Sequence, residues 1–371
     1  GKSVATDKLG NLYVMGYFSG KVDFDNGAGY HPLTSASAKN LFITKYDSSG
    51  ALLWVKTLET SNELQIAVNA LQIAVDDSCN IYFTGLFKQT VDFDPDTSVN
   101  NLTTVPSNAF NVFVCKWDSS GTFLWANKIN YTFGLSNFAI SLTINEFDAI
   151  HLAGSITGNL IFTLKYSSSG STLFSNFLFF DLDIELKSLS VDASGNIIAS
   201  GLFSDDSVDV DPGAGVYNLY ENSGKFFILK LNSTGDFIWA KTIGKPNELV
   251  SKIVCLAITT DSLNNIYFTG SMKDTIDFDP GPGVHNLIAD AFTGGAFIAC
   301  FDSSSSFVFA KMLGKLSTNN MSIMSNNSIV VSGFFSVLVD FDPGPMVYTL
   351  TPPYTQAGFL AATASLLKRC T

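Results

Sequence analysis

DKLGNLYVMG, residues 7–16, is a polar turn followed by an apolar strand that ends in glycine. Related segments follow at residues 76–85, 145–154, 192–201, 261–270 and 324–333. Their final glycines, Gly16, Gly85, Gly154, Gly201, Gly270 and Gly333, are separated by 69, 69, 47, 69 and 63 residues. This recurrence indicates a repeat architecture in which each repeat is one supersecondary unit.

A second recurring segment reads Val-Asp-Phe-Asp at residues 22–25. Close variants, mostly followed by proline and then glycine, occur at residues 91–94, 208–211, 276–279 and 339–342. The third repeat lacks this segment, since Gly154 and Lys165 are 11 residues apart whereas Gly16 and Lys45 are 29 apart. We therefore expect the third repeat to have lost an outer hairpin while keeping its other strands.

A third pattern joins a lysine, or a cysteine in one copy, to an aromatic residue across a turn rich in serine and glycine. The same nine-residue offset joins Lys45 to Trp54, Lys116 to Trp125, Lys165 to Phe174, Lys230 to Trp239 and Cys300 to Phe309. A constant offset through a turn is typical of a hairpin with fixed register. Each repeat is therefore expected to contain four short strands, such as residues 71–75, 81–87, 113–117 and 123–129.

Such four-stranded sheets cannot bury both faces alone, whereas radial stacking around an axis buries them and limits exposed edges. We expect an all-β fold, a β-propeller of about six four-stranded blades with the third shortened, or seven blades if one lies outside this chain. Residues 1–371 are expected to form a single propeller domain, with the aromatic residues of the third pattern packed between blades. The expected blades span approximately residues 1–60, 61–130, 131–180, 181–245, 246–315 and 316–371.

Composition and charge exclude several classes of protein. With 46% hydrophobic and 15% charged residues, the chain is too apolar to be disordered. Its net charge of −12 would repel a polyanion, so nucleic acid is not an expected partner. The sequence contains no apolar run of the roughly 18 residues that a membrane span needs, so we do not expect it to span a membrane. The five cysteines include no Cys-x-x-Cys pair and indicate neither a zinc site nor a disulfide framework.

Together the three patterns resemble the bacterial β-propeller repeat family called SBBP. In the first repeat they read GNLYVMGYF at residues 10–18, VDFD at 22–25 and FITKYDSSGALLWVK at 42–56. The shortened third repeat departs from the family pattern, as does the last repeat, where AATA at residues 361–364 replaces the lysine-containing stretch. The resemblance implies a propeller of exported or cell-surface bacterial proteins, often found beside sorting or adhesion modules. It implies no catalytic residues.

The paired aspartates of the second pattern are the strongest candidates for a metal site. On a strand, the two carboxylates of a pair are expected to point to one face. Calcium takes six to eight oxygen ligands, and Asp92, Asp94 and Asp96 form the copy with three alternating carboxylates. The alternative is that these aspartates accept hydrogen bonds from backbone N–H groups of the following turn. The sequence suggests no cofactor other than calcium.

The histidines do not indicate a general base. His31 and His285 occupy one repeat position, which holds Asn100, Tyr217 and Tyr348 in other copies, and His151 replaces a strand tyrosine. No nucleophile, zinc-protease, phosphate-binding or dinucleotide motif occurs. We therefore expect a protein that is not an enzyme: a binding or scaffold propeller with a protein or glycan partner at the cell envelope. The alternative is a polysaccharide-acting enzyme, a glycosidase or lyase, with carboxylates converging at the axial funnel.

The ends of the chain suggest an incomplete last blade. The sequence starts at Gly1, and we expect any targeting segment to have been removed or to lie outside it. The family resemblance implies an extracytoplasmic location, either cell surface or secreted. By the register of the third pattern, the chain ends at Thr371, where the fourth strand of the sixth blade should form. We expect upstream residues of a longer polypeptide to supply the missing strand, with residues 366–370 as a short substitute.

Overall fold

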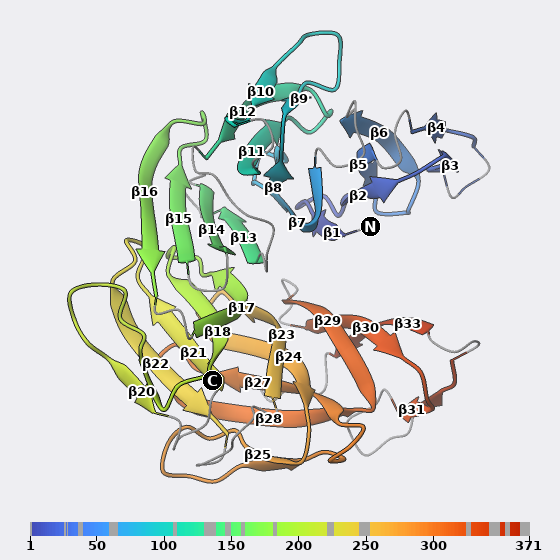
Figure 1. Ribbon diagram of the computed structural model, residues 1–371. Helices are drawn as coiled ribbons and strands as arrows, with labels where there is room; N and C mark the ends of the chain where they lie inside the picture. Colours follow the sequence, from blue (N-terminus) through green and yellow to red (C-terminus); the bar gives the residue numbers. More distant parts are fainter. Residues whose placement is uncertain are drawn as a thin grey trace. The chain divides into compact units, whose positions relative to one another are not determined.

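The computed structural model describes residues 2–25, 27, 29–35, 40–58, 66–106, 110–129, 139–144, 150–156, 160–180, 184–220, 226–244, 253–323, 328–340, 349–352 and 357–363 (Figure 1). The regular secondary structure of these residues is β-strand and includes no helix, which confirms the all-β expectation. The chain divides into two compact units, Gly1–Thr157 with Leu164–Ser175, and Gly158–Thr163 with Asn176–Thr371.

Five sheets contain four strands each, hydrogen-bonded in chain order apart from small inserted ribbons. The first sheet consists of β1 (Ser3–Thr6), β2 (Leu12–Phe18), β5 (Asn40–Tyr46) and β6 (Leu52–Leu58). The second consists of β7 (Ile66–Val75), β8 (Ile81–Phe87), β11 (Asn111–Trp117) and β12 (Phe123–Lys128). The third is β13 (Ala139–Ile144), β14 (Ile150–Ile156), β15 (Leu160–Tyr166) and β16 (Thr172–Phe179). The fourth consists of β17 (Ile184–Val191), β18 (Ile197–Phe203), β21 (Phe226–Leu231) and β22 (Phe237–Ile243). The fifth consists of β23 (Ile253–Thr260), β24 (Ile266–Met272), β27 (Gly295–Phe301) and β28 (Phe307–Gly314).

The sixth sheet has three strands in the described part of the chain: β29 (Leu316–Ile323), β30 (Ile329–Phe335) and β33 (Ala357–Thr363). The described residues thus form five complete blades, rather than the six or seven that the sequence suggested. Residues 366–370, expected to substitute for a missing strand, lie outside the described part. The assignment of all blades to one domain stays a prediction.

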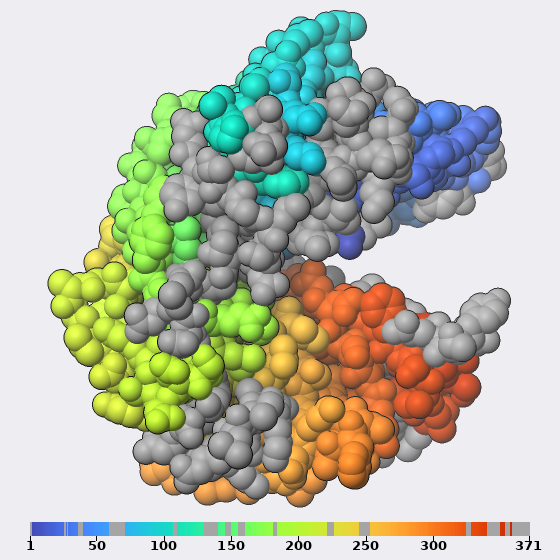
Figure 2. Space-filling view, viewed as in Figure 1, coloured from blue at the N-terminus to red at the C-terminus, as the bar shows by residue number. Residues whose placement is uncertain are grey.

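Small two-stranded ribbons connect the second and third strands of five sheets. They are β3 (Lys21–Asp23) with β4 (Pro32–Thr34), β9 (Thr90–Asp92) with β10 (Asn101–Thr103), β19 (Ser207–Asp209) with β20 (Asn218–Tyr220), β25 (Thr275–Asp277) with β26 (Asn286–Ile288), and β31 (Val339–Asp340) with β32 (Thr349–Leu350). The β9–β10 ribbon, cyan in both views, projects from its sheet (Figures 1 and 2). In the third repeat only residues 157–159 separate β14 from β15, which confirms the expected loss of a hairpin.

The core lies between sheets that pack through their first strands and their middle strands. In the first unit β1 packs against β7, and in the second β17 packs against β23, which packs against β29. Every residue of β8 and β11 is buried, and both strands are rich in aromatic and β-branched residues that suit a pleated, covered surface. One buried cluster joins the first two sheets, and includes Tyr13, Met15 and Phe83. Repeated antiparallel sheets packed in this way are blades of the β-propeller type.

Candidate functional site

The paired aspartates of each ribbon serve as acceptors for the backbone of the loop that they begin. Asp92 Oδ1 accepts hydrogen bonds from the N–H groups of Asp94 at 3.1 Å and Asn100 at 2.8 Å, and Asp94 Oδ1 accepts one from Asp96 N–H at 3.0 Å. The same bonds recur at the pairs Asp23/Asp25, Asp209/Asp211 and Asp277/Asp279. The described ribbons therefore show the backbone-bonded arrangement that was the alternative to a metal site.

The expectation that both aspartates of a pair lie on a strand is wrong. Each of these ribbon strands ends at its first aspartate, for example β9 at Asp92, and the second aspartate lies in the loop. The chain bends there because the first carboxylate bonds the N–H groups of residues two and eight positions later. Asp340 is the last residue of β31, and Asp342 lies outside the described residues.

Three of these loops close tightly around the second carboxylate. A Cβ atom added to Gly29 would lie 2.0 Å from Asp25 Oδ2, and one on Gly283 would lie 2.1 Å from Asp279 Oδ2. Glycine at this position therefore avoids a shift of the aspartate side chain that a Cβ atom would require. In the second repeat the side-chain amide of Asn100 instead donates to Asp94 Oδ2 at 3.3 Å.

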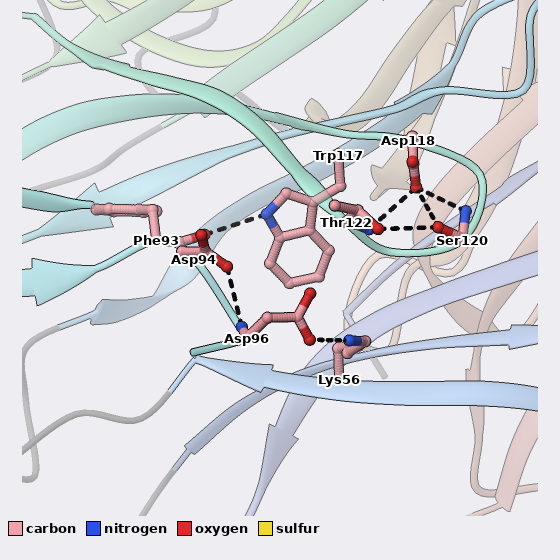
Figure 3. Close-up of polar contacts among 8 residues, drawn as sticks. All are labelled: Lys56, Phe93, Asp94, Asp96, Trp117, Asp118, Ser120 and Thr122. Atoms are coloured by element: carbon pink, nitrogen blue, oxygen red, sulfur yellow. Dashed lines mark hydrogen bonds and ion pairs between the residues drawn. The ribbon is translucent and has the colours of Figure 1, made fainter. Parts of the chain in front are cut away.

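The three carboxylates predicted to bind calcium have three different sets of partners. Asp92 and Asp94 accept the backbone bonds described above, while Asp96 forms an ion pair with Lys56 on β6. Figure 3 shows the Asp96 carboxylate turned toward Lys56 and away from Asp94. Within the described ranges, no group of three or more His, Cys, Asp or Glu side chains is placed to hold a metal ion. Calcium binding at Asp92, Asp94 and Asp96 stays a prediction.

In two repeats, the position that His31 and His285 share attaches a ribbon to an outer strand. Tyr217 packs on Phe237 with ring centroids 4.5 Å apart, and its hydroxyl donates to the Ala240 carbonyl at 3.5 Å. His285 packs on Phe307 at 4.8 Å, with Nε2 3.1 Å from the Ala310 carbonyl oxygen.

His31, by contrast, is exposed, and its Nδ1 lies 3.5 Å from Asp25 Oδ2. His151 is buried on β14, as its strand position suggested. The sequence indicated that the position shared by His31 and His285 lies at the surface. It did not reveal that this position anchors two of the ribbons. The signal that could have revealed this role is that every copy holds a side chain able to form a hydrogen bond.

The lysine and tryptophan of the third pattern bind the turn of the next sheet. Lys45 Nζ and Trp54 Nε1 both donate to the Ser119 carbonyl, at 3.0 and 3.2 Å. Lys116 Nζ and Trp125 Nε1 donate in the same way to the Ser168 carbonyl, at 3.2 and 3.1 Å. These contacts agree with the expectation that the aromatic residues of the third pattern pack between sheets. The shared carbonyl was not foreseen, because it lies in another repeat.

Buried aspartates at the turn after the first strand are also committed to the fold. Asp76 Oδ2 accepts hydrogen bonds from the Asn80 amide at 2.8 Å and the Tyr82 hydroxyl at 3.0 Å, and it lies 3.7 Å from Lys116 Nζ. In the first repeat, Asp7 Oδ2 likewise accepts hydrogen bonds from the Asn11 amide at 2.8 Å and the Tyr13 hydroxyl at 3.1 Å. Burial raises the pKa of Asp7, but hydrogen bonds from Asn11 and Tyr13 outweigh it, so the pKa lies below its ordinary value.

The described cysteines are buried and form no disulfide with one another. Burial raises the pKa of Cys255 to about 12 and that of Cys115 well above its ordinary range. A thiol with a raised pKa carries little thiolate and is a weak nucleophile. These cysteines therefore behave as small apolar residues of the core.

One class of exposed residue was not found from the sequence. Tyr30, Val99, Val216 and Val284, called here the ribbon-tip residues, occupy the same position in four ribbon loops and are 65–72% exposed. Each directly precedes the position that holds His31 or its counterpart. An apolar residue repeated at this position was visible in the sequence, but its exposure depends on how the ribbon folds.

These features define an all-β repeat protein of the propeller class, in which the described paired carboxylates bond to the backbone. In the described residues, no helix has the length and hydropathy required to cross a membrane. No protein-family model matches the sequence, so membership in the SBBP family stays a prediction.

Comparison with curated proteins finds an uncharacterized WD repeat-containing protein of Acanthamoeba polyphaga mimivirus, 24% identical over 249 residues. The match covers 55% of this chain and 17% of that protein. Among solved structures, a protein of unknown function from Bacteroides caccae has a TM-score of 0.41 at 9% identity, over 78% of both chains. A DUF4221 family member from Bacteroides vulgatus has the same TM-score at 10% identity, over 97% of both chains. The Dos1 propeller also has a TM-score of 0.41 at 10% identity, over 90% of this chain and 66% of that one.

Proposed function

We propose that the chain is a non-catalytic binding module that presents its outer ribbons to a protein partner. In this proposal the sheets belong to one propeller, which is part of an exported or cell-surface bacterial protein. The observation that carries the proposal is the exposure of the ribbon-tip residues, which are 65–72% exposed at the same position in four ribbons. Single exposed apolar residues are common on protein surfaces. An apolar residue that is exposed at the same position in several repeats is a feature of binding surfaces on repeat proteins.

The hydrogen bonds made by the aspartate carboxylates support a role without catalysis. In the four described pairs, each carboxylate accepts at least one backbone hydrogen bond within 3.1 Å. A general acid or base needs a proton-transfer position that faces the substrate, and these oxygens face their own loops. The buried aspartates at the turns are likewise bonded to tyrosine, asparagine and lysine.

The chemistry of the ribbon-tip residues favours a protein over a glycan. Three of the four are valines, which offer apolar area but no hydrogen bonds and no aromatic face. Apolar area of this kind is buried in protein interfaces, whereas sugars need polar groups beside any ring that packs on them.

The proposal is tested by capturing partners from the envelope of the source cells, identifying one, and titrating it calorimetrically. The double variant Val216→Ser, Val284→Ser removes two ribbon-tip side chains from exposed loops. We expect its Kd to rise at least about tenfold, since burying a valine contributes roughly 1.5–3 kcal/mol. The control variant Leu9→Ser, Leu263→Ser removes apolar side chains that are also exposed, but at the turn after the first strand. Equal affinities for the two double variants would show that the ribbons are not the binding surface.

A further inference from the structure

Two ribbons of the second unit carry apolar side chains at both ends of their outward face. Residues two apart on a strand share a face, so β20 and β26 each turn their first and third residues outward. Together with the ribbon-tip residues, these outward positions are Val216, Asn218 and Tyr220 in one ribbon and Val284, Asn286 and Ile288 in the other. Their four apolar side chains are 52–72% exposed, whereas Leu219 is buried. The ribbons of the first unit instead have Thr34 and Thr103 at the position of Tyr220 and Ile288.

The same two ribbons are acidic. Residues 204–220 contain four aspartates and no lysine or arginine, and residues 273–290 contain four aspartates and one lysine. Asp209 and Asp277 lie directly across the strands from the central asparagines of the two outward faces, so their side chains belong to those faces. Among the described residues, no ion pair involves Asp209 or Asp277. Apolar side chains and negative charge therefore lie together on each face.

Two lysines of the first unit show how a cationic side chain binds a ribbon. Lys21, the first residue of β3, places Nζ 5.5 Å from the ring centroid of the ribbon-tip residue Tyr30. Lys56 forms an ion pair with Asp96 in the loop of the second ribbon (Figure 3). The residues of β19 and β25 that correspond to Lys21 are Ser207 and Thr275. A cationic group at this position of the second unit has to come from another molecule.

We propose that the outward faces of β19–β20 and β25–β26 bind a basic segment of the protein partner. Lysine or arginine side chains of the segment meet the ribbon carboxylates, while its apolar side chains cover the exposed residues of each face. Charge complementarity selects this occupant, because a chain with a net charge of −12 attracts a basic segment and repels an acidic one. The inference rests on the proposed function, and it names the chemistry of the partner and the two ribbons that bind it.

The two kinds of contact respond differently to salt. Attraction between exposed charges is screened over about 10 Å at 0.1 M salt, so the charged contacts weaken as ionic strength rises. Burial of apolar area is not screened in this way. Tyr220 also offers an aromatic ring to a cationic group, as Tyr30 does to Lys21. We therefore expect the affinity to fall several-fold between about 50 and 300 mM salt without being lost.

Two synthetic peptides titrated into the full chain by fluorescence anisotropy test the inference. One peptide of about twelve residues repeats lysine, valine and serine, and the other has glutamate at every lysine position. At about 50 mM salt we expect the basic peptide to bind with a Kd on the order of 10–100 µM. The acidic peptide should bind at least about tenfold more weakly, because its carboxylates meet those of the ribbons.

The double variant Asp209→Asn, Asp277→Asn removes one charge from each face. An asparagine oxygen still accepts backbone bonds of this kind, as Asn232 Oδ1 does from the N–H groups two and four residues later. We expect the Kd for the basic peptide to rise about fivefold and to depend less on salt. The matched control is Asp47→Asn, Asp302→Asn, which removes two exposed carboxylates that also accept backbone bonds, but in turns away from the ribbons. The control should bind the peptide as the wild type does.

Four results would overturn the inference: equal affinities for the two peptides, a Kd that salt does not change, equal weakening by the two double variants, or no binding of either peptide. Failure of the proposed function gives a different result, in which Val216→Ser, Val284→Ser and its control bind the captured partner equally. If those valine substitutions weaken the captured partner while the peptides show no preference for positive charge, the ribbons remain the binding surface and the basic segment is rejected. Thermal unfolding checks that each variant is folded.

Discussion

Replacing Ser305 by glycine should stabilise the folded protein. Ser305 lies in the turn between β27 and β28 with a φ of 74°, in the left-handed region that favours glycine. The matching turns of the first four sheets have Gly50, Gly121, Gly170 and Gly235, with φ between 84° and 96°. Serine is therefore strained at a position where the rest of the chain uses glycine.

The tryptophan expected to pack on this turn lacks the hydrogen bond that its counterparts make. Trp239 Nε1 is buried and has no hydrogen-bond partner among the described residues, whereas Trp54 and Trp125 bond to carbonyls of the next turn. A Cβ atom on Gly170 would lie 2.7 Å from the Trp125 ring, so a side chain at this turn position pushes the ring outward. The Ser305 side chain is expected to displace Trp239 in this way.

Three contributions set the expected change in the free energy of unfolding. Relief of the left-handed conformation contributes about 1 kcal/mol, and recovery of the indole hydrogen bond contributes about 1 kcal/mol. The greater freedom of glycine in the unfolded chain costs about 0.5–1 kcal/mol. The Ser305→Gly variant should therefore be more stable than the wild type by about 1 kcal/mol.

Urea unfolding followed by tryptophan fluorescence measures this difference. The reverse substitution, Gly170→Ser, serves as the matched control and should destabilise the protein, since it introduces the same strain beside Trp125. In a Trp239→Phe background, the gain from Ser305→Gly should fall by about the value of one hydrogen bond. A Ser305→Gly variant that is less stable than the wild type would refute the reasoning.

Further outcomes follow from the other turns and loops. Trp125→Phe keeps an aromatic side chain but loses the bond to the Ser168 carbonyl and part of the ring area, so the free energy of unfolding should fall by at least about 1 kcal/mol in urea titrations; no loss would contradict the shared-carbonyl contact. Burial raises the pKa of Asp118, but hydrogen bonds from Ser120 and Thr122 outweigh it and the pKa is lowered. The stability from Asp118 is therefore present above its ordinary pKa of 3.8 and lost as pH falls through the folded value, so the advantage over Asp118→Asn should vanish in acid unfolding curves. A difference independent of pH would count against that assignment. If calcium binds the carboxylates of Asp92, Asp94 and Asp96, calorimetric titration into the wild type should give a heat that Asp94→Ala abolishes; negligible heats in both would leave backbone bonding as the only role of the ribbon carboxylates.

The strand pairing within each repeat could be predicted from the sequence because hairpin register is local. The offset of nine residues places Lys45 opposite Trp54 and Lys116 opposite Trp125, and a register shift directly after each lysine accounts for the odd offset. The predicted strands at residues 81–87 and 123–129 correspond to β8 and β12 within one residue. The missing hairpin of the third repeat was likewise predictable, because the 11 residues from Gly154 to Lys165 are too few to contain it.

Contacts between repeats could not be predicted in the same way. No local spacing indicates that the Ser119 carbonyl accepts bonds from both Lys45 and Trp54, since donors and acceptor lie more than 60 residues apart. The ribbon aspartates were expected on one strand face, but the backbone bonds to Asp92 end the strand there. The exposure of Val216 likewise depends on a loop closed around Asp211, which alternation of residue types does not reveal.

Hydrogen–deuterium exchange of the chain, alone and bound to its captured partner, tests the binding role of the ribbons most directly. We expect slower exchange on binding in peptides that contain Tyr30, Val99, Val216 or Val284, because those loops would be covered. Peptides that contain Leu9 or Leu263 should exchange at the same rate with and without the partner. Protection confined to those turns, with the ribbon loops unchanged, would contradict the proposal that the ribbons form the binding surface.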